Sequence, residues 1–179
     1  MPRYFYTVSA HPGSTTDESS FVGAVKRILS HDTIGWQAAA PDKISFHFLG
    51  TKRPTINWDL RPSDVYLHVM LVPAERIRTL FPSFQDNSMS VCDMRTRVCF
   101  INEYRWLNGS PGHFKGDLTT YRHYVINHEV GHAMGCGHLY LAYLERHYPE
   151  SPCPVMVQQT KGHGSLLPNG HPTPRDLLV

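Results

Sequence analysis

Alternating and helical spacings of apolar residues predict the first elements of the chain. Aromatic and β-branched residues alternate with others from Arg3 to Ser9, as in a strand. Apolar residues then recur at helical spacing from Phe21, so we expect a helix from about Asp17 to Ser30. The preceding Thr15-x-x-Glu18 has the form of a capping box that closes the start of this helix.

Short apolar runs in the middle of the chain predict three more strands. They cover Ile44 to Leu49, Val65 to Val72 and Val98 to Ile101. A stretch rich in proline and polar residues, which includes Trp58, separates the first two, and we expect a polar connection from Pro82 to Arg97 before the third.

A second helix follows the Gly/Pro-rich break at Asn108 to Gly112. Its pattern runs from Tyr121 to Met134, and Gly135 can end it because glycine accepts the left-handed conformation found beyond helix ends. Candidate N-terminal caps are Asp117, Thr119 and Thr120.

The rest of the chain has one short helical pattern, from Leu139 to His147, and is rich in Pro, Gly and His from Pro149 onward. The order of elements predicts an α/β (α+β) fold, in which a mixed sheet is backed by two helices and followed by an irregular C-terminal part. A length of 179 residues fits one domain, residues 1–179.

Charge and hydropathy exclude two classes of partner. The net charge of +2 is small and the lysines and arginines are scattered, so we expect no nucleic-acid partner. The longest apolar runs, around Val69 to Val72, are too short for a membrane span. The N-terminal residues Met1 to Tyr4 enter the first strand directly, without the apolar core of a signal peptide.

Four cysteines are compatible with two disulfides or with free thiols. They lack the C-x-x-C spacing of a structural zinc site. For an exported protein we expect Cys92 to pair with Cys99 across a turn, and Cys136 to pair with Cys153.

The chemistry of the chain is concentrated in residues 128–138, which read His-Glu-Val-Gly-His-Ala-Met-Gly-Cys-Gly-His. His128 and His132 lie one helical turn apart and can therefore reach one ion. Gly135 lets the chain leave the helix, so that His138 can return to the same ion. Three nitrogen ligands with a fourth position open for water are typical of a catalytic zinc site.

Glu129 is the candidate catalytic residue of this motif. A zinc ion lowers the pKa of its bound water and polarises a carbonyl group. Glu129 can take the proton of that water and deliver it to a leaving amine. The sequence therefore predicts a zinc-dependent endopeptidase that cleaves extended polypeptides, with one Zn2+ per chain. We expect it to act as a monomer on a peptide or protein substrate.

The spacing H-E-x-x-H-x-x-G-x-x-H is also the signature of metzincin zinc peptidases, which the chain resembles. Their second mark is a methionine turn, and Pro154-Val155-Met156-Val157 is similar to it. This resemblance implies that the Met156 side chain lies beneath the three histidines as an apolar floor. Some metzincins have a tyrosine ligand two residues after this methionine; here Gln158 stands at that position.

Tyr124 to His132 and Pro154 to Thr160 further resemble a bacterial metzincin-like family of unknown function, as does the segment Val98 to Trp106. This resemblance implies secretion, although the chain begins without a signal core. It also implies an upper subdomain at about residues 1–135 and a lower one at about 136–179. The antiparallel edge strand that pairs with substrate would be Arg97 to Asn102.

Two alternatives remain open at this point. In a gluzincin-like site, Glu145 or Glu150 would replace His138 as the third ligand. In a different class of function, the chain would be a zinc-binding interaction or toxin-like module with little hydrolytic activity.

The remaining histidines and large aromatic residues are assigned mainly to the core or the surface. His163 and His171 follow the methionine turn and could line the substrate pocket. Trp106, Tyr121 and Tyr124 are expected to be core residues.

Overall fold

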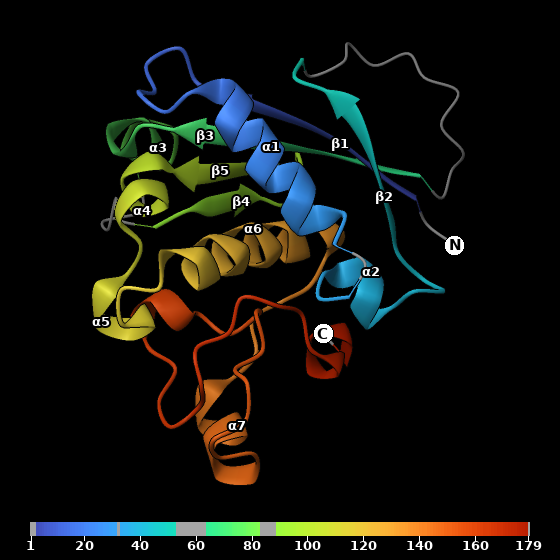
Figure 1. Ribbon diagram of the computed structural model, residues 1–179, viewed down its shortest axis with the longest axis vertical. Coiled ribbons are helices and arrows are strands. Elements are labelled where there is room, and N and C mark those ends of the chain that lie inside the picture. The colour runs from blue at the N-terminus through green and yellow to red at the C-terminus, as the bar shows by residue number, and fades with distance from the viewer. Residues whose placement is uncertain (1–2, 32, 53–63, 83–88, 179) are drawn as a thin grey trace.

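A five-stranded sheet forms the upper part of the molecule (Figure 1). The computed structural model describes residues 3–31, 33–52, 64–82 and 89–178. The strands are β1 (Arg3–Ala10), β2 (Ser45–Gly50), β3 (Val65–Val72), β4 (Val91–Asp93) and β5 (Val98–Asn102). Their spatial order is β2-β1-β3-β5-β4, and only β4 runs antiparallel to its neighbour. The predicted strands and the mixed α/β class are confirmed; most of the expected Pro- and polar-rich stretch, Trp58 included, lies outside the described residues.

The position of the sheet edge differs from the prediction. The segment Arg97 to Asn102 is not an edge, because β5 pairs with β3 on one side and with β4 on the other. The edge is β4, hidden in the predicted polar connection because three residues are too few to show an alternating pattern. A tight turn produces it: the Asp93 carboxylate accepts hydrogen bonds from the backbone N–H groups of Arg95 and Thr96.

Two long helices cover one face of the sheet (Figure 1). The helices are α1 (Glu18–Leu29), α2 (Trp36–Ala39), α3 (Ala74–Leu80), α4 (Glu103–Asn108), α5 (Pro111–Phe114), α6 (Leu118–Met134) and α7 (Leu141–His147), with 3-10 turns η1 (Gln159–Lys161) and η2 (Pro174–Leu178). The predicted α1, α6 and α7 are confirmed, whereas α2 to α5 are too short to give a helical period. None of the helices in the described part of the chain has the length and apolar character that a membrane crossing requires.

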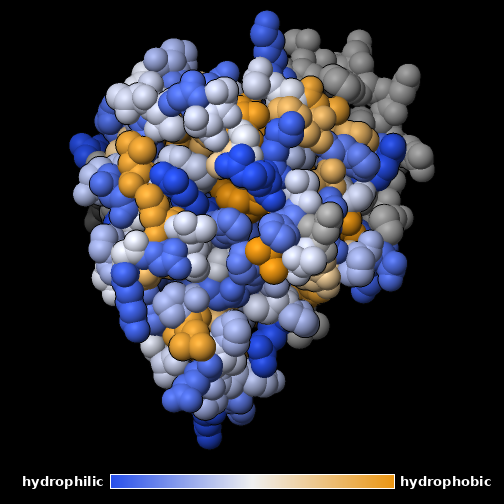
Figure 2. Space-filling view, in the orientation of Figure 1, coloured by the Kyte–Doolittle hydropathy of each residue, from blue (hydrophilic) through white to orange (hydrophobic). Residues whose placement is uncertain are grey.

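The main core lies between the sheet and these helices. Along β1, Tyr4, Tyr6 and Val8 point into it, and the helical stripe of α1 packs against them. That stripe consists of Phe21, Val25, Ile28 and Leu29. Full burial of one such side chain contributes about 1.5–3 kcal/mol. On the face drawn in Figure 2, hydrophobic residues form separate patches among hydrophilic ones.

The start of α1 is capped differently from the prediction. Asp17, and not Thr15, is the N-cap, since its carboxylate accepts a hydrogen bond from the Ser20 N–H at 2.8 Å. The backbone N–H of Thr15 instead donates to a carboxylate oxygen of Glu103, also at 2.8 Å. Glu18 is not part of a capping box, because its carboxylate accepts from the Ala10 N–H. A partner 88 residues away therefore overrides the local motif.

Helix α6 lies between the sheet and the C-terminal segment (Figure 1). Its N-cap is Asp117, and it ends at Gly135, which has a left-handed backbone with φ of 105°. Below it, the Met156 side chain is fully buried and leaves no space for a Cβ atom at Gly131. The Met156 side chain thus packs against α6 where the helix has no side chain.

The first prediction tests this close approach. We expect Gly131→Ala to destabilise the protein by about 1–3 kcal/mol, because the new methyl group overpacks against Met156 and Trp36. Gly112→Ala is the control, since a Cβ there meets no atom within 4 Å. Thermal unfolding measures both variants. If Gly131→Ala costs the same in a Met156→Ala background as in the wild type, the contact with Met156 is not the constraint.

Candidate metal centre

Two histidines of the centre are oriented by backbone carbonyl groups. His128 is buried, and its Nδ1 atom lies 2.6 Å from the carbonyl oxygen of Val155. The Nδ1 atom of His132 lies 2.9 Å from the carbonyl oxygen of Cys136. A carbonyl oxygen only accepts, so each Nδ1 carries the proton and each Nε2 of the neutral ring has a free lone pair.

The third histidine is brought back by the turn after α6. Gly135 ends the helix, and His138 then places its Nε2 atom 3.0 Å from Nε2 of His132. The Nε2 atoms of His128 and His132 are 3.2 Å apart. The three candidate ligand atoms all lie within 4.8 Å of one another. The Nε2 lone pairs of His128 and His132 face each other and repel unless a cation lies between them, and Nε2 of His138 lies beside them, so the three histidines can bind a metal ion.

Desolvation favours the neutral form of these rings, most strongly for His128, while His138 is the exposed member of the cluster. Burial is the main cause that lowers the pKa of His128 to about 3, and the neighbouring His132 adds to the effect. The pKa values of His132 and His138 are also lowered, again mainly by burial. Neutral imidazole is the form that binds metals, so the ligands are in the required state at pH 7.

Glu129 lies in the same cavity as the three histidines. Its carboxyl group is buried, and burial raises its pKa to about 8, while a hydrogen bond from the backbone of Cys92 acts in the opposite direction. A bound cation nearby would favour the ionised carboxylate. Glu129 is therefore held near the candidate ligands without belonging to the cluster that converges on the ion.

The cavity beside the centre has a volume of about 590 Å³. Its walls come from β4, from α6 and from the segment after Met156. Tyr121 and Tyr124 are buried, as predicted, but they also line this cavity, since they precede His128 by about two turns and one turn on the same helix face. Sequence reasoning misses Cys92, Met94 and Lys161, which line the cavity from elements with no helical or strand signal.

The segment Pro154 to Val157, which the sequence predicts to be a methionine turn, is held from two sides. Its Val155 carbonyl group holds His128, and the backbone N–H of Met156 donates to the Asp176 carboxylate at 2.8 Å. Asp176 is fully buried in η2, and burial raises its pKa. The sequence gives no sign of this role, because an isolated Asp in a Pro-rich tail carries no motif.

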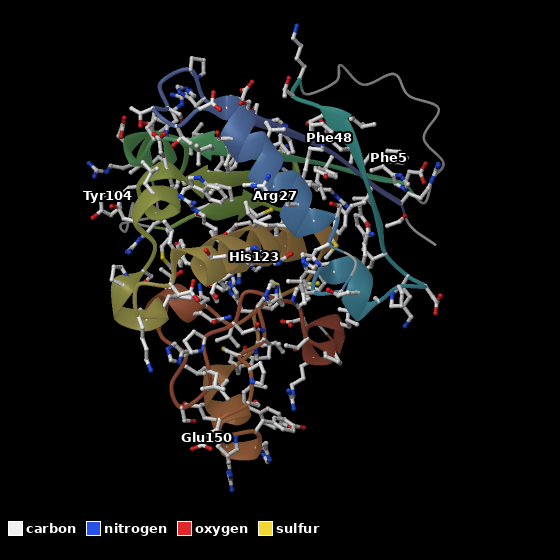
Figure 3. All side chains as sticks on the ribbon, in the orientation of Figure 1. Phe5, Arg27, Phe48, Tyr104, His123 and Glu150 are labelled. Atoms are coloured by element: carbon white, nitrogen blue, oxygen red, sulfur yellow. The ribbon has the colours of Figure 1, made fainter. Side chains whose placement is uncertain are left out.

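Neither of the other candidate histidines lines the cavity. His163 has both ring nitrogens beside backbone oxygens, those of Leu166 and His113. His171 packs edge-on against His123 of α6. His123 borders a separate hollow between α6 and α1, which Arg27 of α1 also lines (Figure 3). The geometry therefore does not support a pocket-lining role for His163 and His171, which the sequence left as one option.

The alternative third ligands are also placed elsewhere. The Glu145 carboxylate accepts a hydrogen bond from the Ser165 N–H at 2.9 Å. Glu150 lies at the far end of the projection formed by α7 (Figure 3). With His138 in the cluster and both carboxylates outside it, the geometry does not support a gluzincin-like site.

All four cysteines are free thiols. Cys92 and Cys99 are opposed on β4 and β5, with their sulfur atoms 3.7 Å apart. Cys136 packs against the main core, whereas Cys153 belongs to a second cluster with Leu144, Val157 and Leu166. Neither of the two expected disulfides is therefore formed in this structure, although the first pair is in contact.

Comparison with known proteins gives one result. No curated protein and no solved structure matches the chain. A family model described as "Protein of unknown function (DUF3152)" matches residues 2–166, a range that contains the three histidines, Glu129 and Met156. Since this match covers most of the 179 residues, the chain belongs to that family.

Proposed function

We propose that this protein is a zinc-dependent endopeptidase of the metzincin type. The observation that carries the proposal is the convergence of three neutral imidazole nitrogens beside a buried glutamate in one cavity. Three protein ligands leave a coordination position open, as in catalytic rather than structural zinc sites. Nitrogen donors without thiolates or carboxylates favour zinc over magnesium or calcium.

The residues around the centre have separate tasks in the proposed reaction. His128, His132 and His138 would hold the ion, which when bound supplies a lowered pKa for its water and polarises the scissile carbonyl. Glu129 takes a proton from the attacking water and later delivers it to the leaving amine. The Val155 and Cys136 carbonyl groups keep two of the imidazoles in the tautomer that this arrangement needs.

Strand β4 offers the surface on which an extended peptide would lie. It is an edge strand of the described sheet, and Val91 and Cys92 line the cavity next to Glu129. An edge strand presents unpaired backbone groups, to which a substrate strand can add. We therefore assign to β4 the substrate-pairing role that the resemblance to metzincins implies for the sheet edge.

The burial of the Glu129 carboxyl group also favours a catalytic function over the function of a zinc-binding interaction module. Burial of a carboxyl group is unfavourable, and the raised pKa of Glu129 reports that cost. Binding of zinc by three histidines would not require this group. A buried carboxyl group beside the three candidate ligands is expected of a proton carrier.

The second prediction concerns metal content. We expect one zinc ion per chain and a sharp loss of zinc in His138→Ala, because two imidazoles hold the ion poorly. His147→Ala is a matched control on the surface of α7. Elemental mass spectrometry after dialysis gives the ratio of metal to protein. Unchanged zinc content in His138→Ala would contradict the three-histidine site.

The third prediction separates binding from catalysis. We expect Glu129→Gln to retain zinc and the fold, while cleavage of a quenched-fluorescence peptide library falls by about 10²–10⁴-fold. Zinc content and cleavage are measured on the same preparation. Loss of zinc would make Glu129 structural, and cleavage at the wild-type rate would place the chemistry elsewhere. Zinc binding by a wild-type protein that cleaves no peptide would favour the interaction module.

The fourth prediction follows from the pKa of Glu129. In the metal-free protein this pKa is about 8, above its ordinary value of 4.5, so the folded state favours the neutral carboxyl group. Its contribution to stability is present below the ordinary value and is lost as the pH rises through about 8. We therefore expect metal-free Glu129→Gln to melt above the wild type at pH 9, by several degrees, and the gap to narrow at pH 5. Calorimetry in the presence of a chelator measures it; an identical gap at both pH values would contradict the assignment.

A further inference from the structure

We propose that Cys92 and Cys99 form a redox-active dithiol in the wall of the centre, which a low-molecular-weight disulfide oxidises to an intramolecular disulfide. We further infer that this modification lowers the hydrolytic activity. The second statement rests on the proposed function, whereas the first does not.

The two thiols are placed for bond formation. Cys92 and Cys99 are direct partners in the antiparallel pairing of β4 and β5, so both side chains point to the same face of the sheet. Their sulfur atoms are 3.7 Å apart. Directly opposed residues have Cα atoms about 4.5–5.5 Å apart, which lies within the range that disulfides span. The sulfur atoms need to approach by less than about 2 Å to reach the length of an S–S bond.

The different burial of the two thiols sets the order of the reaction. Cys92 is half-buried and lines the cavity, whereas Cys99 is fully buried. The Cys92 thiolate attacks a disulfide R–S–S–R, whose S–S bond breaks to release one R–SH and leave a mixed disulfide. The Cys99 sulfur, having lost its proton, then attacks Cys92 Sγ and releases the second R–SH. Overall, two protein thiols are oxidised to one disulfide and R–S–S–R is reduced to two thiols.

Both cysteines also contact the residue on which the proposed reaction depends. The Cys99 thiol donates a hydrogen bond to the backbone carbonyl oxygen of Glu129 at 3.2 Å. The backbone of Cys92 forms a hydrogen bond with the Glu129 carboxyl group. Oxidation removes the thiol donor to the Glu129 carbonyl group and turns the Cys92 side chain from the cavity wall towards Cys99, so the surroundings of Glu129 change on two sides. Displacement of a catalytic group by about 1 Å can cost 10²-fold in rate.

Strand β4 couples the dithiol to the centre, because it both carries Cys92 and forms the edge that we assign to substrate. It has only three residues, and β5 is its partner in the described sheet. A covalent link between Cys92 and Cys99 would therefore hold the edge in register against β5 and change the Cys92 side chain that lines the cavity. Cys153, in the separate apolar cluster, has neither relation to the centre.

The experiment uses the zinc-loaded full chain and glutathione disulfide as the oxidant. The protein is equilibrated at several ratios of glutathione disulfide to glutathione, and each sample is divided. Peptide mapping by mass spectrometry locates disulfides, and a fluorogenic peptide measures kcat. We expect a Cys92–Cys99 disulfide, a fall in kcat of about tenfold or more, and recovery on addition of reduced glutathione.

Three variants separate the steps. Cys99→Ser should stop at the mixed disulfide between Cys92 and glutathione. Cys92→Ser should form neither this mixed disulfide nor the intramolecular disulfide. Cys153→Ala, the control, should respond like the wild type. If Cys99→Ser does not fold, Cys92→Ser still tests the order, because its side chain is only half-buried.

The outcomes distinguish the two proposals. Absence of a Cys92–Cys99 bond under full oxidation overturns the dithiol site, and a bond with unchanged kcat overturns the effect on activity. A reduced, zinc-loaded protein that cleaves nothing overturns the proposed function, while the mapped disulfide still supports the dithiol.

Discussion

The architecture depends on the burial of polar residues in the middle of α6. Asn127, His128 and Glu129 are consecutive and all buried, and buried polar groups are costly unless they are hydrogen-bonded. Their partners come from distant parts of the chain: the carbonyl groups of Gly170 and Val155, and the backbone of Cys92. The hydrogen bonds of these three side chains therefore fix the positions of both the C-terminal segment and strand β4 relative to α6.

The C-terminal segment meets this demand with little regular secondary structure. Side chains take the place of a backbone ladder: Gln159 donates to the carbonyl groups of Pro154 and Asn169, and Asp176 accepts from the Met156 N–H. Hydrogen bonds from polar side chains of this tail thus hold the segment around Met156 in place. Through the Val155 carbonyl they reach His128 and help to orient its ring.

Burial also gives the candidate metal centre its chemistry. It lowers the pKa of the three histidines and raises that of Glu129, so the metal-free site favours neutral groups throughout. A divalent cation can be bound by the neutral imidazole nitrogens, and its positive charge favours the ionised form of the Glu129 carboxylate. In the function that we propose, the ion and the ionised Glu129 therefore stabilise each other. Because β4 contacts Glu129, a chemical change in β4, such as the proposed oxidation of Cys92, can alter the activity.

The elements with a clear local period and the candidate ligands of the centre could be predicted from the sequence alone. Spacing on one helix and one glycine turn was sufficient to bring His128, His132 and His138 together, because these constraints act within eleven residues. Three other features are visible only in the folded chain: β4 forms a sheet edge, Glu103 binds the loop before α1, and Asp176 accepts a hydrogen bond from Met156. Those features depend on pairing between residues far apart in the chain and on elements of a few residues, for which no local pattern exists.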